Sequence, residues 1–356
     1  MRLRVAIIGA GIGKAHLDGY LASPELFEVV AICDLDAARA APLVEQAGAI
    51  YMPSLDQAIV HPDLDIIDIC LPPELHKAAI LAALTEGKHV VCEKPLVASL
   101  ADLDDVEAAS AKTSRLVMPM FQYRFGQGIG QLKHLIDLGL AGRPLVATLE
   151  THWNRGPDYY AVPWRGKWET ELGGAIVGHA IHAHDLLISV LGPAKRVQAR
   201  LATSVNPIEV EDCAAITIEM ANGALATSSV TLGNADDRSR LRFCFSEMSA
   251  ESGISPYNPG TAPWRFVARA PAQQQAIEAA LSTYPPHLEG FARQFQLLHG
   301  AIIDGKPLPV TLDDARASLE LITAIYHGNA TAKAVDLPLD RRQAGYDGWL
   351  LSVRNN

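Results

Sequence analysis

The sequence has few cysteines, and their spacing indicates neither a disulfide framework nor a zinc site. Five cysteines occur in 356 residues, and none of them forms a Cys-x-x-Cys pair. Each lies in or beside an apolar run, so we expect buried free thiols in a reducing compartment. The chain also lacks an apolar run long enough to cross a bilayer, and glycines interrupt the first apolar run too early for a signal peptide. We therefore expect a cytoplasmic protein with no membrane partner.

Positive charge is scarce as well. The chain has 30 lysines and arginines against 40 acidic residues, a formal net charge of −10, and no dense basic tract. This balance argues against nucleic acid as a partner, because a phosphate backbone requires concentrated positive charge. Internal repeats and low-complexity segments are also absent. A hydrophobic content of 49% and a charged content of 20% are typical of globular proteins, and the length predicts about two domains.

A short apolar strand, residues 4–8, runs into a turn rich in glycine and then into a helix-like segment. This context turns a weak glycine pattern into a prediction of dinucleotide binding. Glycines let the backbone approach a pyrophosphate, and the free N–H groups of a helix N-terminus favour the anion. The spacing is one residue tighter than the usual Gly-x-Gly-x-x-Gly. The predicted cofactor contacts in this turn are Gly9, Gly11, Ile12 and Gly13.

The second predicted strand, residues 27–33, ends at Asp34, roughly 20 residues after the glycines, where the nucleotide fold places its ribose-binding acid. A carboxylate at this position accepts hydrogen bonds from the ribose 2′-hydroxyl and repels a 2′-phosphate. The sequence therefore favours NAD over NADP. The alternative is an ordinary loop aspartate.

The segment from Gly87 to Leu96, GKHVVCEKPL, joins a buried strand to two charges and a proline. In an open parallel sheet, ligands bind outside the carboxyl ends of the strands, so we expect Glu93 and Lys94 to lie at the nucleotide site. A surface loop with an incidental ion pair is the alternative. Strands alternate with helices throughout this part of the chain, which predicts a Rossmann domain with a doubly wound parallel sheet over residues 1–122.

Residues 123–356 change character, because several strands follow one another in series. Asn222-Gly223 is a strong hairpin signal between two of them. We predict an α+β domain with a large, mostly antiparallel open sheet that binds substrate and forms the oligomer.

Within this second domain, Gly173 to Leu191 reads as a helix opened by two glycines. A helical periodicity of 100° places Gly178, His182 and Asp185 on one face, with His179 nearby and His184 pointing elsewhere. A histidine oriented by an aspartate can act as a base near neutral pH. A satisfied core histidine and a metal site built from the three histidines are the alternatives, and we predict no metal.

The preceding residues 159–168 combine four aromatic rings with an arginine and a lysine. Aromatic faces stack on sugar C–H surfaces, and arginine donates paired hydrogen bonds to hydroxyls or anions. Tyr160, Trp164 and Arg165 are therefore candidate substrate contacts. Simple packing of the loop against the sheet is the alternative.

Taken together, five motifs give the chain a resemblance to the family of glucose–fructose oxidoreductase and inositol 2-dehydrogenase (Gfo/Idh/MocA). The motifs are GAGIGKAH, AICD, PPELH, GKHVVCEKPL and GGAIVGHAIHAHD. The resemblance implies that Lys94 lies beside the nicotinamide, that Glu93 contacts the cofactor, and that His182 is the acid/base. It implies a substrate-orienting role for Asp185. We further assign Pro72 and His76 to the cofactor, and Lys94, Arg124, His179, His182 and Asp185 to the substrate.

These residues predict an NAD-dependent oxidoreductase that transfers hydride between nicotinamide and a hydroxyl-bearing carbon of a sugar, sugar derivative or cyclitol. His182 would take the hydroxyl proton while Lys94 stabilises the developing oxyanion. Two alternatives remain: a lyase or glycosidase that uses tightly bound NAD transiently, and a non-catalytic relative that senses nucleotide.

Three more expectations follow from the resemblance. The Lys94-Pro95 bond should be cis, and the protein should be a homodimer or homotetramer through the open face of the second sheet. Relatives commonly carry an aspartate where this chain has Gly178, so His179 is expected either to replace that acid at the substrate or merely to pack against the sheet.

Overall fold

The computed structural model describes residues 1–343 and 345–349, which form two compact units. The first contains Met1–Phe121 and Gly290–Arg316, and the second begins at Gln122 and includes the described residues from Ala317 onward. The sequence-based division at residue 122 kept Gly290–Arg316 in the second domain. The structure places this segment in the first unit because helix α11 (Gly290–Asp304) packs on α1, with the ring of Phe295 stacked on Tyr20 at 3.9 Å.

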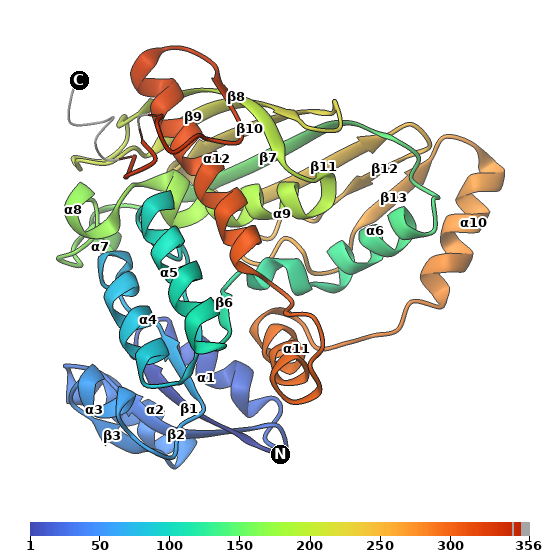
Figure 1. Cartoon of the computed structure of the whole chain (residues 1–356). Coiled ribbons are helices and arrows are strands. Elements are labelled where there is room, and N and C mark those ends of the chain that lie inside the picture. Colours follow the sequence, from blue (N-terminus) through green and yellow to red (C-terminus); the bar gives the residue numbers. More distant parts are fainter. Residues whose placement is uncertain (344, 350–356) are drawn as a thin grey trace. The chain divides into compact units, whose positions relative to one another are not determined.

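The first unit contains a parallel sheet in the order β3-β2-β1-β4-β5-β6 (Figure 1). Its strands are β1 (Leu3–Ile8), β2 (Phe27–Cys33), β3 (Ile50–Met52), β4 (Ile66–Ile69), β5 (His89–Cys92) and β6 (Val117–Pro119). Strands β1 and β4 lie at the centre and are almost fully buried, as their predominantly apolar sequences, LRVAII and IIDI, predict. This order reverses direction between β1 and β4, as in a doubly wound fold. The predicted Rossmann sheet is therefore confirmed.

Helices connect these strands, and several begin at side-chain caps. Asp36 accepts hydrogen bonds from the first turn of α2, and Ser99 does so for α5. The helix α1 that follows β1 has no such side-chain cap. The connecting helices are α1 (Gly13–Leu21), α2 (Ala37–Ala47), α3 (Leu55–Ile59), η1 (Pro73–Leu75), α4 (His76–Thr85) and α5 (Leu100–Thr113).

The second unit contains a sheet in the order β13-β12-β11-β7-β10-β9-β8-β14. The paired strands are antiparallel except β7 and β10, which are parallel. Gly223, at a φ of +86°, makes the predicted tight turn between β9 and β10. The strands are β7 (Pro144–Asn154), β8 (Ala194–Ala202), β9 (Cys213–Met220), β10 (Leu225–Thr231), β11 (Gly233–Phe245), β12 (Met248–Glu251), β13 (Arg265–Ala268) and β14 (Val335–Asp336).

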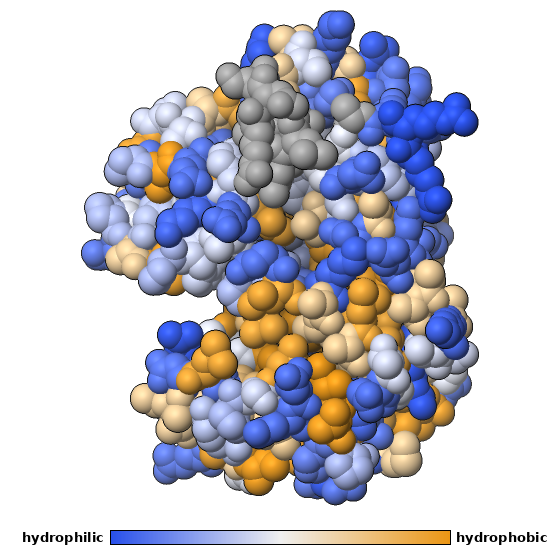
Figure 2. Space-filling model, turned by 60° about the vertical axis from the view of Figure 1, so that its left-hand side comes forward, coloured by the Kyte–Doolittle hydropathy of each residue, from blue (hydrophilic) through white to orange (hydrophobic). Residues whose placement is uncertain are grey.

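Residues of these strands alternate between a buried and an exposed face. Helices α6 and α9 lie along one side of the sheet (Figure 1). Figure 2 shows one face of the molecule, on which hydrophilic residues predominate in the upper part of the view and hydrophobic residues gather in the lower part. The helical elements are η2 (Gln122–Phe125), α6 (Gln127–Asp137), α7 (Pro157–Tyr160), α8 (Trp168–Glu171), the π-helical turn η3 (Ile176–Ala180), α9 (Ile181–Leu191), α10 (Pro271–Ser282) and α12 (Leu312–Thr331).

The segment Trp168–Leu191 is long and apolar enough to cross a membrane by length and composition alone. However, 78% of its most apolar window is buried inside the protein. We therefore interpret it as the core helix of the second unit.

Candidate active site

The glycine turn after β1 has the geometry of a pyrophosphate cradle. A Cβ at Gly9, whose φ is +105°, would lie 2.4 Å from the carbonyl oxygen of Cys70, so only glycine fits there. A Cβ at Gly11 would meet no atom within 4 Å, which leaves the turn open on that side. Because Ile12 offers α1 no side-chain cap, the first amide N–H groups of the helix are suited to an anion. The turn therefore fits a dinucleotide.

Asp34 lies at the carboxyl end of the neighbouring strand β2 and is half-buried. Its carboxylate accepts hydrogen bonds from the backbone N–H groups of Ala10 and Asp36, both at 2.8 Å. These bonds fix the carboxylate beside the glycine turn, and each oxygen has a further lone pair for a ribose hydroxyl. The predicted ribose contact remains a prediction that this position supports.

The EKP segment, defined here as Glu93, Lys94 and Pro95, follows directly after β5, and the Lys94-Pro95 bond is cis, as predicted. Glu93 is 7% exposed, whereas Lys94 is half-buried. One carboxylate oxygen of Glu93 accepts a hydrogen bond from His16 at 3.1 Å, and the other accepts the backbone N–H of Lys94 at 3.1 Å. The carboxylate thus anchors the segment that carries the lysine.

His76 approaches the same segment from the start of α4. Its ring is fully buried, and its two nitrogens face the carbonyl oxygens of Leu71 and Pro95 at 2.8 and 2.9 Å. Burial lowers the pKa of this imidazole. These contacts fix the loops after β4 and β5, and the cofactor contacts predicted for His76 and Pro72 remain predictions.

In the second unit, the start of the long helix is not regular. Residues Ile176–Ala180 form a π-helical turn before α9, so a periodicity of 100° does not hold across His179. His182, in the first turn of α9, is 6% exposed and stacks on Tyr123 with ring centroids 4.3 Å apart. Sequence reasoning missed Tyr123, because nothing in its local pattern distinguishes it from a core residue.

Asp185 forms a paired ion bridge with Arg124. The arginine donates from Nε at 2.7 Å and from Nη2 at 2.6 Å, and the two side chains are 1% and 8% exposed. This paired geometry holds the guanidinium in one orientation. Both residues were predicted to bind substrate, and the structure brings them together. Asp185 orients Arg124, and any contact of either side chain with substrate remains a prediction.

His184 points away from this group, as the sequence predicted. Its Nε2 lies 2.9 Å from the hydroxyl of Ser228 on the sheet, and complete burial lowers its pKa to about 4. His179, in contrast, has its Nε2 3.3 Å from the hydroxyl of Tyr159 and its ring beside Trp153. His179 and His184 thus make different contacts rather than contributing to a shared ligand set.

A cluster of aromatic and charged side chains surrounds His179. Tyr159 accepts a hydrogen bond from Arg165, whose guanidinium also lies over the rings of Tyr159 and Trp164 at 4.0 and 4.4 Å. Arg165 also lies 3.3 Å from the carboxylate of Glu171. Tyr160 packs edge-on against Tyr159. The structure therefore gathers the three predicted aromatic and basic residues around Tyr159.

Arg155 is part of this cluster, although no sequence motif singles it out. Its guanidinium lies over the rings of Trp153, Tyr159 and Tyr257 and pairs with Asp237 at 3.1 Å. These partners come from separate strands and a distant loop, so no local pattern connects them. Their position beside Tyr159 extends the polar and aromatic lining around His179.

Glu171 is a further residue that sequence reasoning did not select. Its carboxylate lies beside Gly178, where the chain has no acid of its own. A Cβ at Gly178 would have the Oε1 of Glu171 as its nearest neighbour, at 3.8 Å. The other oxygen of this carboxylate accepts the backbone N–H of Gly166 at 2.6 Å. A carboxylate is therefore present beside Gly178, although another part of the chain supplies it.

The parallel sheet, the glycine cradle and the acid after β2 define a dinucleotide-binding oxidoreductase domain. Residues 3–121 match the model of the oxidoreductase family with an NAD-binding Rossmann fold, and residues 129–251 match that of the GFO/IDH/MocA C-terminal domain. The chain belongs to the GFO/IDH/MocA oxidoreductase family.

Relatives of known name agree with this assignment. Inositol 2-dehydrogenase 3 of Saccharopolyspora erythraea is 40% identical over 149 residues, which cover 41% of this chain and 44% of that protein. Inositol 2-dehydrogenase of Salmonella typhimurium is 34% identical over 165 residues, 45% of this chain and 49% of that protein. The matched part thus spans about half the length of these curated relatives.

Solved structures match over more of the chain. The WlbA dehydrogenase from Chromobacterium violaceum, solved with NADH and UDP-GlcNAcA, is 26% identical with a TM-score of 0.83, and the match covers 95% of this chain and 97% of that one. Levoglucosan dehydrogenase, solved with NADH and levoglucosan, has a TM-score of 0.80 over 95% of this chain and all of that one. Its 23% identity establishes a shared fold alone.

Proposed function

We propose that this protein is an NAD-dependent dehydrogenase that oxidises a hydroxyl-bearing carbon of a sugar, sugar derivative or cyclitol. The observation that carries the proposal is the EKP segment held at the carboxyl end of β5, on the sheet edge that also bears the glycine cradle and Asp34. The names of the relatives support the substrate class, since inositol and levoglucosan are both polyhydroxylated rings.

NAD, when bound, would supply the hydride acceptor. The chain itself would supply the proton chemistry and the orientation of substrate. We assign to His182 the removal of the proton from the substrate hydroxyl, and to Lys94 the stabilisation of negative charge that develops on that oxygen. Arg124, held in one orientation by Asp185, would bind a further hydroxyl or an anionic group of the substrate.

The aromatic cluster around His179 suits a sugar-like ligand. The cluster combines the rings of Trp153, Tyr159 and Trp164 with the guanidinium groups of Arg155 and Arg165, which lie over them. Such a lining combines stacking on C–H surfaces with hydrogen bonds to hydroxyls. We therefore propose His179, Tyr160, Trp164 and Arg165 as substrate contacts.

The direct test is formation of NADH with a panel of inositols, hexoses, anhydrosugars and nucleotide sugars. We expect turnover with at least one member, and loss of most of it in the Lys94→Ala variant, since a charge-stabilising group typically contributes about 100-fold or more to kcat. A protein that binds NAD but turns over no member would contradict the proposal. Product without net NADH would favour a lyase or glycosidase, and full activity of Lys94→Ala would remove the assigned role of the lysine.

We also propose that the protein is a cytoplasmic homodimer or homotetramer. All five cysteines are free, as expected of a reducing compartment. One face of the second sheet is exposed along four neighbouring strands, with Thr148, Gln198, Thr217, Thr227 and Ser229 pointing outward. A second copy of this face is the proposed cover.

A further inference from the structure

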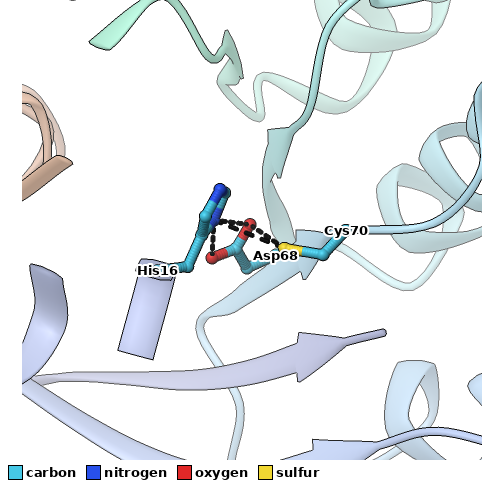
Figure 3. Close-up of side chains that lie close together, drawn as sticks. All are labelled: His16, Asp68 and Cys70. Atoms are coloured by element: carbon cyan, nitrogen blue, oxygen red, sulfur yellow. Dashed lines mark hydrogen bonds and ion pairs between the residues drawn. The ribbon is translucent and has the colours of Figure 1, made fainter. Parts of the chain in front are cut away.

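His16 is a fully buried histidine with an acidic partner at each ring nitrogen. It lies in the first turn of α1, three residues after the last glycine of the cradle, and is 0% exposed. Its Nδ1 lies 2.8 and 3.0 Å from the two carboxylate oxygens of Asp68 on β4 (Figure 3), and its Nε2 lies 3.1 Å from Oε1 of Glu93. The ring therefore connects two carboxylates from neighbouring strands.

This geometry favours a positively charged ring. Where both carboxylates are ionised they can only accept hydrogen bonds, so both nitrogens of His16 donate and the ring is an imidazolium. Burial acts to lower the pKa of His16, but the adjacent Asp68 and Cys70 raise it, and the pKa lies well above its ordinary value.

The groups that surround the His16 ring are consistent with a positive charge on it. Strand β4 and the residue after it contribute Asp68 and Cys70, and the segment after β5 contributes Glu93. On α1 itself, Tyr20 is buried and the Asp68 charge helps to raise its pKa. Helix α11 contributes only uncharged rings, including that of Phe291 at 4.6 Å.

A metal ion is a poor explanation for the cluster. The ligand atoms of His16, Asp68 and Cys70 lie within 4.8 Å of one another. Burial raises the pKa of the Cys70 thiol to about 12, so without a metal this sulfur is protonated at neutral pH. The Nδ1 of His16 is also engaged with Asp68 at hydrogen-bond distance (Figure 3).

We propose that His16 is a positioning residue, an imidazolium that clamps the Glu93 carboxylate to Asp68 and thereby fixes Lys94 relative to the glycine cradle. The inference rests on the role proposed above for Lys94. One oxygen of Glu93 receives the His16 bond and the other receives the N–H of Lys94, so a change at His16 is transmitted directly to the lysine backbone. Helix α1 thus carries both the start of the pyrophosphate site and the anchor of the EKP segment.

Removing the clamp affects catalysis more than nucleotide affinity. In His16→Asn, the shorter amide can still reach Asp68 but not Glu93, which removes the His16 hydrogen bond from the buried Glu93 carboxylate. The glycine cradle is unchanged, so NAD retains its main anion contacts. We expect kcat per folded protein to fall about tenfold or more, while the Kd for NAD changes less than about threefold.

A double-mutant cycle tests whether His16 acts through Glu93. In His16→Asn, Glu93→Gln and the double variant, the losses in kcat should not add, because the second change removes a partner already lost. His89→Gln is the control: this histidine accepts a backbone N–H, from Leu116, at the opposite end of β5 from the EKP segment. Additive losses, or a kcat of His16→Asn within about twofold of wild type, would overturn the clamp.

A measurement without turnover separates this inference from the proposed function. Nitrogen-15 NMR of the wild-type imidazoles should show His16 with both nitrogens protonated at about pH 8, above the ordinary pKa of histidine. A neutral ring at that pH would also overturn the clamp, even if His16→Asn failed to fold. Failure of the proposed function itself would appear elsewhere, as NAD binding without turnover of any member of the substrate panel.

Discussion

His179 and His184 lie on one helical segment but in opposite surroundings. His184 is bonded to Ser228 in the core, and its low pKa of about 4 keeps it neutral over the physiological range. His179 faces Tyr159 and Trp153 beside two arginines. Only the second environment suits contact with a polar ligand.

We predict that His179→Ala lowers kcat about tenfold or more, because the substrate would lose a proposed hydrogen-bonding group and Tyr159 would lose one of its partners. Tyr159→Phe should lower it less, since the ring face and the imidazole both remain. Steady-state kinetics across the pH range provides the measurement. If kcat/KM of His179→Ala equals that of the wild type at every pH, His179 only packs against its neighbours.

At the scale of elements, the helical segment η3–α9 begins at a buried acid. The Oε1 atom of Glu211 accepts the N–H groups of Gly174 and Ile176 and the hydroxyl of Tyr326 from α12. Burial raises the pKa of Glu211 to about 7 despite these bonds. The carboxyl therefore fastens the start of the segment that carries His179 and His182.

This carboxyl predicts a pH-dependent stability. Because the pKa is raised in the folded state, folding favours the protonated acid, and this contribution is present below about pH 4.5 and lost as the pH rises to about 7. The difference is on the order of 3 kcal/mol for a shift of this size. Glu211→Gln keeps the acceptor oxygen without the ionisation. Its denaturant midpoint should exceed that of the wild type by more at pH 8 than at pH 5, and a constant difference would contradict the prediction.

The sequence predicted what local patterns determine. The glycine turn, Asp34 and the EKP segment follow predicted strands, so their common edge was foreseeable. The packing of α11 in the first unit could not be predicted in this way. The contact of Phe295 with Tyr20 joins residues that are far apart in the sequence, so no local pattern indicates it. The π-helical turn and the placement of Glu171 beside Gly178 also depend on tertiary packing, which no periodicity encodes.

For the whole molecule, the exposed sheet face predicts association. We expect sedimentation at micromolar concentration to give a dimer or tetramer, and Thr217→Arg to weaken it, because a twofold axis would bring the new charges of two copies onto one interface. Thr283→Arg serves as the control: it introduces the same charge at an exposed position at the end of α10 and should leave assembly unaltered. A monomeric wild type would contradict the proposal.

The central claim is hydride transfer from a substrate carbon, and isotopic labelling tests it most directly. A substrate selected from the panel is prepared with deuterium on the carbon that bears the reacting hydroxyl and is incubated with the protein and NAD. We expect one deuterium in the NADH formed, a slowed rate, and little transfer with Lys94→Ala. Product that forms while the cofactor pool stays fully oxidised and unlabelled would contradict it.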